Sequence, residues 1–118
     1  MAESRSSNDF TTIEKARKHE ALNPLLKAMH QEFQELSKKK SDGALNKGKV
    51  QIVNRLLKDV QTILDTEPSR PYLDLLDEES LPQNSDVSLI LSQYCAAMKS
   101  FHEKYYGWNG LTHTWLTK

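Results

Sequence analysis

Apolar residues recur at intervals of three and four along three long stretches of the chain, which is the pattern of an amphipathic α-helix. The first stretch contains Leu25, Leu26, Met29, Phe33 and Leu36. The second, which is the most regular, contains Leu45, Ile52, Val53, Leu56, Leu57, Val60, Ile63 and Leu64. The third contains Val87, Ile90, Leu91, Tyr94, Cys95, Met98, Phe101 and Tyr105. We therefore predict three long helices that each turn one face toward a common core.

Capping and turn residues set the expected bounds of these helices. Asn23-Pro24 predicts the start of the first, because Asn caps free amides and Pro fits a first helical turn. Lys38–Lys40 would close this helix, and the break at 41–43 follows. The second helix is expected over about 45–65. The third begins at Asn84 or Ser85 and stops at Gly107, a natural helix terminator.

Shorter elements are expected between and after the long helices. Thr11 and Glu14 have capping-box spacing, which predicts a separate short helix over about 12–20. One or two helical turns fit around Tyr72–Asp77. After the third helix, Asn109-Gly110 is a strong hairpin signal, and the residues that follow it alternate and favour strands.

Together these elements predict an all-α fold. The expected architecture is a small up-down three-helix bundle with one or two extra short helices, the 72–76 segment packed across one end, and a hairpin-like or irregular aromatic tail. The chain divides into a flexible N-terminal tail (1–10), a helical domain (11–107) and the aromatic tail (108–118). Its 118 residues suffice for one such domain without metals or disulfides.

Composition points to an intracellular protein. One cysteine, Cys95, excludes an intramolecular disulfide, and the polar start of the chain does not resemble a signal peptide. No apolar run is long enough to cross a membrane, so we expect no membrane association and a cytoplasmic location. The 16 basic and 16 acidic side chains balance, which argues against a dedicated nucleic-acid binder. The first 60 residues nevertheless carry 12 basic and 8 acidic side chains.

Residues that support catalysis or metal binding do not occur in the required patterns. The four histidines have no helical pair spacing, and we expect them to be scattered over the surface: His19, His30, His102 and His113. Cys95 lies on an apolar face and is expected to pack as a small hydrophobe. The acidic run at Asp74, Asp77, Glu78 and Glu79 is typical of a solvated face. We therefore expect no enzyme activity, no metal and no cofactor.

Two segments are candidates for binding a protein partner. The first alternates acidic residues with leucines, as in a peptide face that a groove accepts, although the same leucines could simply cover one end of the bundle. The second is the tail, whose tryptophans are unfavourable in water and either fold back or anchor an interface. The partner-binding candidates are Tyr72, Leu73, Leu76, Asp77, Trp108 and Trp115.

A basic cluster at the first turn between long helices supports an alternative function. It consists of Lys38, Lys39, Lys40, Lys47 and Lys49. Such a cluster could contact phosphates of a nucleic acid, but it carries no interleaved aromatics for base stacking, and a solvated lysine surface is the simpler interpretation.

The sequence thus favours a non-enzymatic protein–protein interaction module, a small helical subunit or adaptor of a larger intracellular complex. The partner is a different protein or a second copy, since three helices leave the wide apolar stripe of 45–64 incompletely covered. The alternative is an accessory nucleic-acid-binding subunit of a nucleoprotein complex.

Overall fold

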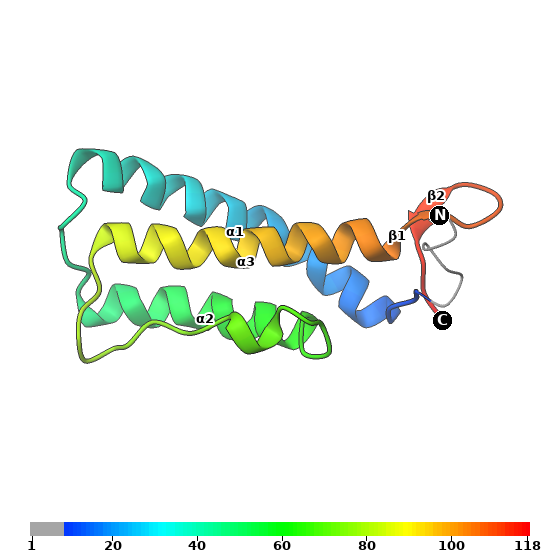
Figure 1. Ribbon diagram of the computed structural model, residues 1–118, viewed down its shortest axis with the longest axis horizontal. Helices are drawn as coiled ribbons and strands as arrows, with labels where there is room; N and C mark the ends of the chain where they lie inside the picture. Colours follow the sequence, from blue (N-terminus) through cyan, green and yellow to red (C-terminus); the bar gives the residue numbers. More distant parts are fainter. Residues whose placement is uncertain (1–8) are drawn as a thin grey trace.

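The structure, a computed structural model, describes residues 9–118 and is mostly helical (Figure 1). Its elements are α1 (Ile13–Lys39), α2 (Lys47–Ile63), the short 3₁₀ helix η2 (Arg70–Tyr72), α3 (Asn84–Tyr105), β1 (Tyr106–Trp108) and β2 (His113–Trp115). The molecule is elongated, with extents of 49 × 23 × 23 Å. The prediction of three long helices is confirmed, while most of the expected N-terminal tail lies outside the described residues.

Helix α1 is longer than the sequence predicted. We expected a short helix over 12–20 and a second one starting at Asn23-Pro24, but a single helix of 27 residues runs through both segments, with Pro24 inside it. The Thr12 hydroxyl caps it by accepting from the Lys15 amide at 3.1 Å. Proline removes one helical hydrogen bond and bends the helix. Burial of residues on both sides of Pro24, including His19 and Leu26, outweighs this loss.

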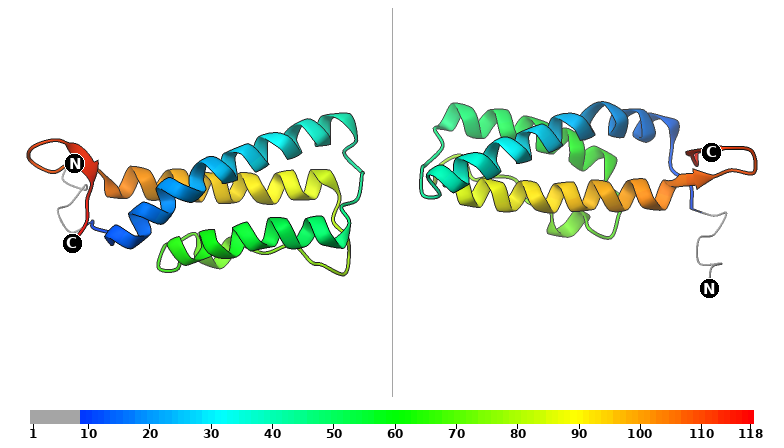
Figure 2. Two further views of the ribbon diagram at one scale, coloured as in Figure 1. Left: turned by 180° about the vertical axis from the view of Figure 1, so that it is seen from behind. Right: turned by 90° about the horizontal axis from the view of Figure 1, so that it is seen from above.

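The order of the helices also differs from the prediction. Helix α1 crosses α3 obliquely, whereas α2 and α3 run in the same direction, with their first residues at one end of the molecule (Figures 1 and 2). The expected up-down order is therefore not found between α2 and α3, although α1 runs opposite to both. Residues 64–83 make this arrangement possible, because they return along the whole length of α2 before α3 begins.

This return segment is extended over 73–77, so the short helix expected around Tyr72–Asp77 is wrong; only η2 precedes it. Side chains of α2 replace the hydrogen bonds that a helix would have formed. The Asn54 amide donates to the Leu76 carbonyl and accepts from the Leu76 amide, both at 2.8 Å. Gln61 donates to the Leu73 carbonyl at 3.1 Å. The segment thus lies along α2 rather than across one end of the helices.

The C-terminal hairpin is confirmed. Strands β1 and β2 pair antiparallel, with Tyr106 opposite Trp115, and Gly110 adopts a φ of 103° in the turn. The chain beyond β2 passes beside the start of α1, where the Thr11 amide donates to the Leu116 carbonyl at 2.9 Å. The hairpin therefore closes the end of the molecule at which α1 begins and α3 ends.

One apolar core joins the three helices and the return segment. Its completely inaccessible large side chains come from all three helices and the residue after α2: Leu26, Val50, Leu57, Val60, Ile63, Leu64, Val87, Leu91, Tyr94 and Met98. The apolar faces of α2 and α3 that the periodicity predicted therefore supply most of the core. Across residues 9–118, none of the helices has the length and apolar character needed to traverse a bilayer.

Candidate functional site

An apolar groove lies between α1 and α2. It comprises two adjoining hollows of about 570 and 640 Å³, which share Met29, Glu32, Phe33 and Ile52. The groove exists because α1 packs mainly against α3 and only loosely against α2. We call it the α1/α2 groove.

Large apolar side chains of the α1/α2 groove are left in water. Leu25 is 57% exposed and Ile52 is 63% exposed. Leu22, Met29 and Leu56 beside them are only partly buried. Exposed apolar residues that gather in one contiguous hollow indicate a binding surface, whereas singly scattered ones do not.

Charged residues follow the α1/α2 groove in a fixed order. Lys40 and Lys49 lie at the end where α1 finishes and α2 begins. Glu32 and Arg55 lie near the middle, and Asp59 lies toward the opposite end. One end of the groove is therefore basic, and its far end carries a carboxylate.

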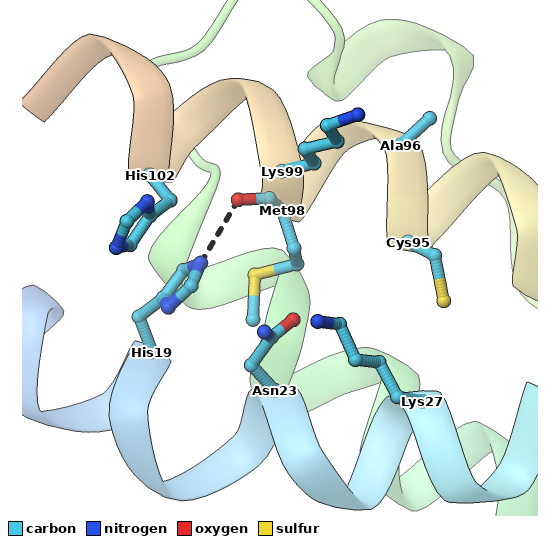
Figure 3. A pocket seen from close by; sticks show the side chains of 8 residues that line it. All are labelled: His19, Asn23, Lys27, Cys95, Ala96, Met98, Lys99 and His102. Atoms are coloured by element: carbon cyan, nitrogen blue, oxygen red, sulfur yellow. Dashed lines mark hydrogen bonds between the residues drawn. The ribbon is translucent and has the colours of Figure 1, made fainter.

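A second hollow, the α1/α3 pocket, has a volume of about 420 Å³ and lies where α1 crosses α3. Helix α1 contributes His19, Asn23 and Lys27, spaced four residues apart and thus on one helical face. Cys95, Ala96, Met98, Lys99 and His102 line the α3 side. Figure 3 shows Asn23 and Lys27 reaching from α1 toward α3, with the Cys95 thiol pointing toward Lys27.

His19 forms the inner wall of the α1/α3 pocket and is only 3% exposed, so the expectation that all four histidines lie on the surface is wrong. Its Nε2 lies 2.9 Å from the Met98 carbonyl oxygen (Figure 3). Its ring stacks on Phe101, with centroids 5.5 Å apart. Burial lowers the pKa of His19, which the bond to Met98 only partly offsets. The charges of His102 and, to a smaller extent, Lys27 lower this pKa further, whereas the charge of Glu20 raises it.

Cys95 is partly buried and packs against the core, as expected for a small hydrophobe. Burial raises the pKa of its thiol, and the charge of Lys27 acts in the opposite direction. A raised pKa leaves little nucleophilic thiolate at neutral pH. Within residues 9–118, no group of three or more His, Cys, Asp or Glu side chains is arranged to hold a metal ion.

The leucine–acid segment divides between core and surface. Leu73 and Leu76 are buried in the core, where they pack along α2. Tyr72 and Asp77 are exposed, and Asp77 accepts a hydrogen bond from the Glu79 amide at 2.9 Å. In the isolated chain, a partner could therefore contact Tyr72 and Asp77 but not the two leucines.

The two tryptophans of the tail have different surroundings. Trp115 packs against His19, Phe101, His102 and Tyr106 and donates from Nε1 to a Glu20 carboxylate oxygen at 3.0 Å. Trp108 remains 60% exposed. Trp115 is therefore a structural residue, whereas Trp108 presents its ring to solvent.

The predicted lysine cluster is brought to one end of the molecule, since α1 ends and α2 begins there (Figure 1). Lys38 pairs with Glu35 at 3.3 Å and Lys47 with Glu79 at 3.5 Å. Among the described residues, Lys39, Lys40 and Lys49 have no side-chain ion pair. The acidic run at 74–79 lies alongside α2 and thus supplies one of the neutralising carboxylates.

Sequence reasoning missed the α1/α2 groove as a site and the α1/α3 pocket entirely. The sequence does contain a pattern that indicates the groove, namely an apolar stripe on α2 that is too wide for two neighbouring helices to cover. No sequence pattern indicates the α1/α3 pocket, because its residues belong to helices that are about 80 residues apart in sequence and meet only in the folded chain.

Searches of known protein families, curated proteins and solved structures found no match to this chain.

Proposed function

We propose that this chain is a protein–protein interaction module whose α1/α2 groove is covered by the same groove of a second copy. The observation that carries the proposal is the pair of exposed apolar side chains, Leu25 and Ile52, in one continuous hollow. Covering such side chains removes apolar surface from water, which is the main driving force of association.

The order of charges along the groove favours a second copy as the occupant. A two-fold axis that reverses the helices places Lys40 and Lys49 of one copy over the Asp59 end of the other. An axis that kept the helices of the two copies parallel would instead place the lysines of one copy against the lysines of the other. Complementary charges fix the orientation of an interface in this way.

The size of the face is sufficient for a stable dimer. At about 1.5 Å per residue, the 17 residues of α2 extend over about 25 Å. A face of that length and two helices wide can bury on the order of 800 Å² per copy, which is the standard size of a stable interface. The resulting contact would stack two layers, each made of α1 and α2 of one copy.

The test is sedimentation equilibrium of the purified chain across the micromolar range. We expect a mass of twice the 13.6 kDa of one chain. Leu25→Glu and Ile52→Glu should each shift the protein toward monomer while circular dichroism stays unchanged. The matched control is Leu89→Glu on α3, which is 61% exposed and lies outside the groove. A wild-type protein that remains monomeric throughout, or a dimer that both groove variants retain, would overturn the proposal.

Nucleic-acid binding through the lysine cluster is the second candidate function. The convergence of Lys39, Lys40 and Lys49 at one end of the molecule favours it. It predicts binding to a DNA or RNA duplex that weakens steeply with salt and with charge reversal at Lys39 and Lys40. If the chain binds neither duplex in low salt, this candidate is excluded.

A further inference from the structure

We propose that the α1/α3 pocket binds a small anionic ligand that carries a carboxylate or phosphate group. This proposal is independent of the groove, since the pocket lies between a different pair of helices and shares no lining residue with it.

The first argument is uncompensated positive charge in a concave site. Lys27 and Lys99 both line the pocket, and no Asp or Glu does. Among residues 9–118, neither lysine has an ion-pair partner, whereas Lys15, Lys38, Lys47 and Lys104 do. Figure 3 shows the Lys27 ammonium extending toward α3, whereas the Lys99 side chain runs along α3 away from Lys27. Lys27 is therefore the charge that faces the hollow, and the protein walls around a concave site focus the field of such a charge on an anion.

The second argument is that the charge of Lys27 acts on the interior of the pocket. Its ammonium lowers the pKa of buried His19 on α1 and counteracts the burial effect on the pKa of Cys95 on α3. Lys27 therefore lies within electrostatic reach of both walls of the pocket. Figure 3 agrees, because Lys27 extends from α1 toward α3.

The third argument is the supply of neutral hydrogen-bond donors. The Asn23 side-chain amide points into the pocket beside Lys27 (Figure 3), and the described residues offer this amide no hydrogen-bond partner. His102 lies next to His19, with ring centroids 5.8 Å apart, and supplies a ring nitrogen at the rim. An amide N–H and an imidazole N–H both donate to carboxylate or phosphate oxygens.

The size of the pocket limits the ligand. Its volume of about 420 Å³ is near the lower end of the range of about 300–1,000 Å³ for small-molecule sites. Ala96, Met98 and Cys95 form an apolar part of the lining. Inorganic phosphate, or a short dicarboxylate whose carbon chain contacts these side chains, fits this combination of charge and size.

The first test is a ¹H–¹⁵N NMR titration with inorganic phosphate and, separately, with succinate, at constant ionic strength. We expect saturable shifts of the amides around Asn23, Lys27 and Cys95–His102. The double variant Lys27→Gln/Lys99→Gln should bind roughly tenfold more weakly or worse. Both lysines are exposed, so the variant is expected to fold.

The matched control is the double variant Lys39→Gln/Lys58→Gln, which removes two exposed lysines outside the pocket. Its affinity should equal that of the wild type. Stronger binding of phosphate than of succinate, or the reverse, identifies the ligand group. Shifts that do not saturate with either anion, or that weaken equally in both double variants, would overturn the proposal.

A second test uses Cys95, the single cysteine of the chain, as a reporter. Its alkylation rate is measured with anionic iodoacetate and with neutral iodoacetamide; in both reactions the thiolate sulfur bonds to the CH₂ carbon and iodide leaves into solution. In the wild type, the ratio of the two rates should exceed that of a free thiol. It should fall several-fold in Lys27→Gln and on addition of phosphate. A ratio that neither change affects would show that the pocket does not concentrate anions.

Discussion

The side-chain amide of Asn54 pairs with both backbone polar groups of Leu76, donating to its carbonyl and accepting from its amide, each at 2.8 Å. Asn54 is buried on the apolar face of α2, so water cannot replace these bonds in the variant. Asn54→Ala is expected to lower the free energy of unfolding by about 2–4 kcal/mol, since two buried groups lose their partners. Urea denaturation measures this loss.

The control for this prediction is Gln51→Ala, which removes an exposed amide that donates to Glu78 at 3.3 Å. Its effect should stay within about 0.5 kcal/mol. If Asn54→Ala and Gln51→Ala have equal effects, the pairing with Leu76 does not hold the return segment in place.

The buried ring of His19 makes stability depend on pH. Burial lowers its pKa in the folded protein below the ordinary value of 6.5. As the pH falls below 6.5, the unfolded chain therefore takes up a proton before the folded chain does, and the free energy of unfolding decreases. The loss continues until the pH reaches the lowered pKa of the folded state. When the pH is above the ordinary pKa of 6.5, the His19 ring is neutral in both the folded and the unfolded chain. The ring then makes no further pH-dependent contribution to the free energy of unfolding.

His19→Gln should reduce the slope of stability against pH between neutral and mildly acidic solution, while its amide can still donate to the Met98 carbonyl. Thermal unfolding at a series of pH values measures the slope, with His113→Gln, an exposed hairpin residue, as the comparison. Identical slopes in wild type and His19→Gln would contradict the assignment.

The two tryptophans are expected to respond differently to truncation. Trp115→Ala removes a ring packed on Phe101 and His19, together with the bond to Glu20, and should cost about 2–4 kcal/mol. Trp108→Ala removes a mostly exposed ring and should change stability by less than about 1 kcal/mol. Denaturant unfolding of both variants checks this, and a larger effect for Trp108 would show that the hairpin packs in another way.

Two glycines should respond to alanine with opposite signs. Gly48 lies in the first turn of α2, where an added Cβ would be 3.5 Å from Asn46 Oδ1, an ordinary contact. Gly48→Ala should stabilise the protein by about 0.5 kcal/mol through helix propensity. Gly110, at a φ of 103°, should lose about 1–2 kcal/mol in Gly110→Ala. Melting temperatures of the two variants should therefore lie on either side of the wild-type value.

The sequence predicted α2 and α3 well because their apolar spacing is regular and polar residues end them. The observed bounds, Lys47–Ile63 and Asn84–Tyr105, differ from the expected ones by about two residues. The hairpin was equally predictable, since the conformation of Gly110 is a property of the local sequence. These features depend on neighbouring residues alone.

The features that the sequence did not reveal depend on contacts between distant segments. Pro24 reads as a helix start, and only the packing of α1 against α3 carries the helix through it. Leu73 and Leu76 have the spacing of a short helix, but the amides of Asn54 and Gln61 on α2 hold the segment extended. The α1/α3 pocket requires the same long-range contact, so its residues carry no local signal.

The crossing of α1 over α3 has a consequence during synthesis. Glu20 on α1 and Trp115 in the hairpin are 95 residues apart. At about 5–20 residues per second, roughly 5–20 s pass between translation of these two residues. During that interval the apolar side of α1 that α3 will cover is exposed to water. Until α3 and the hairpin have been synthesised, this side of α1 lacks the surface that covers it in the folded protein.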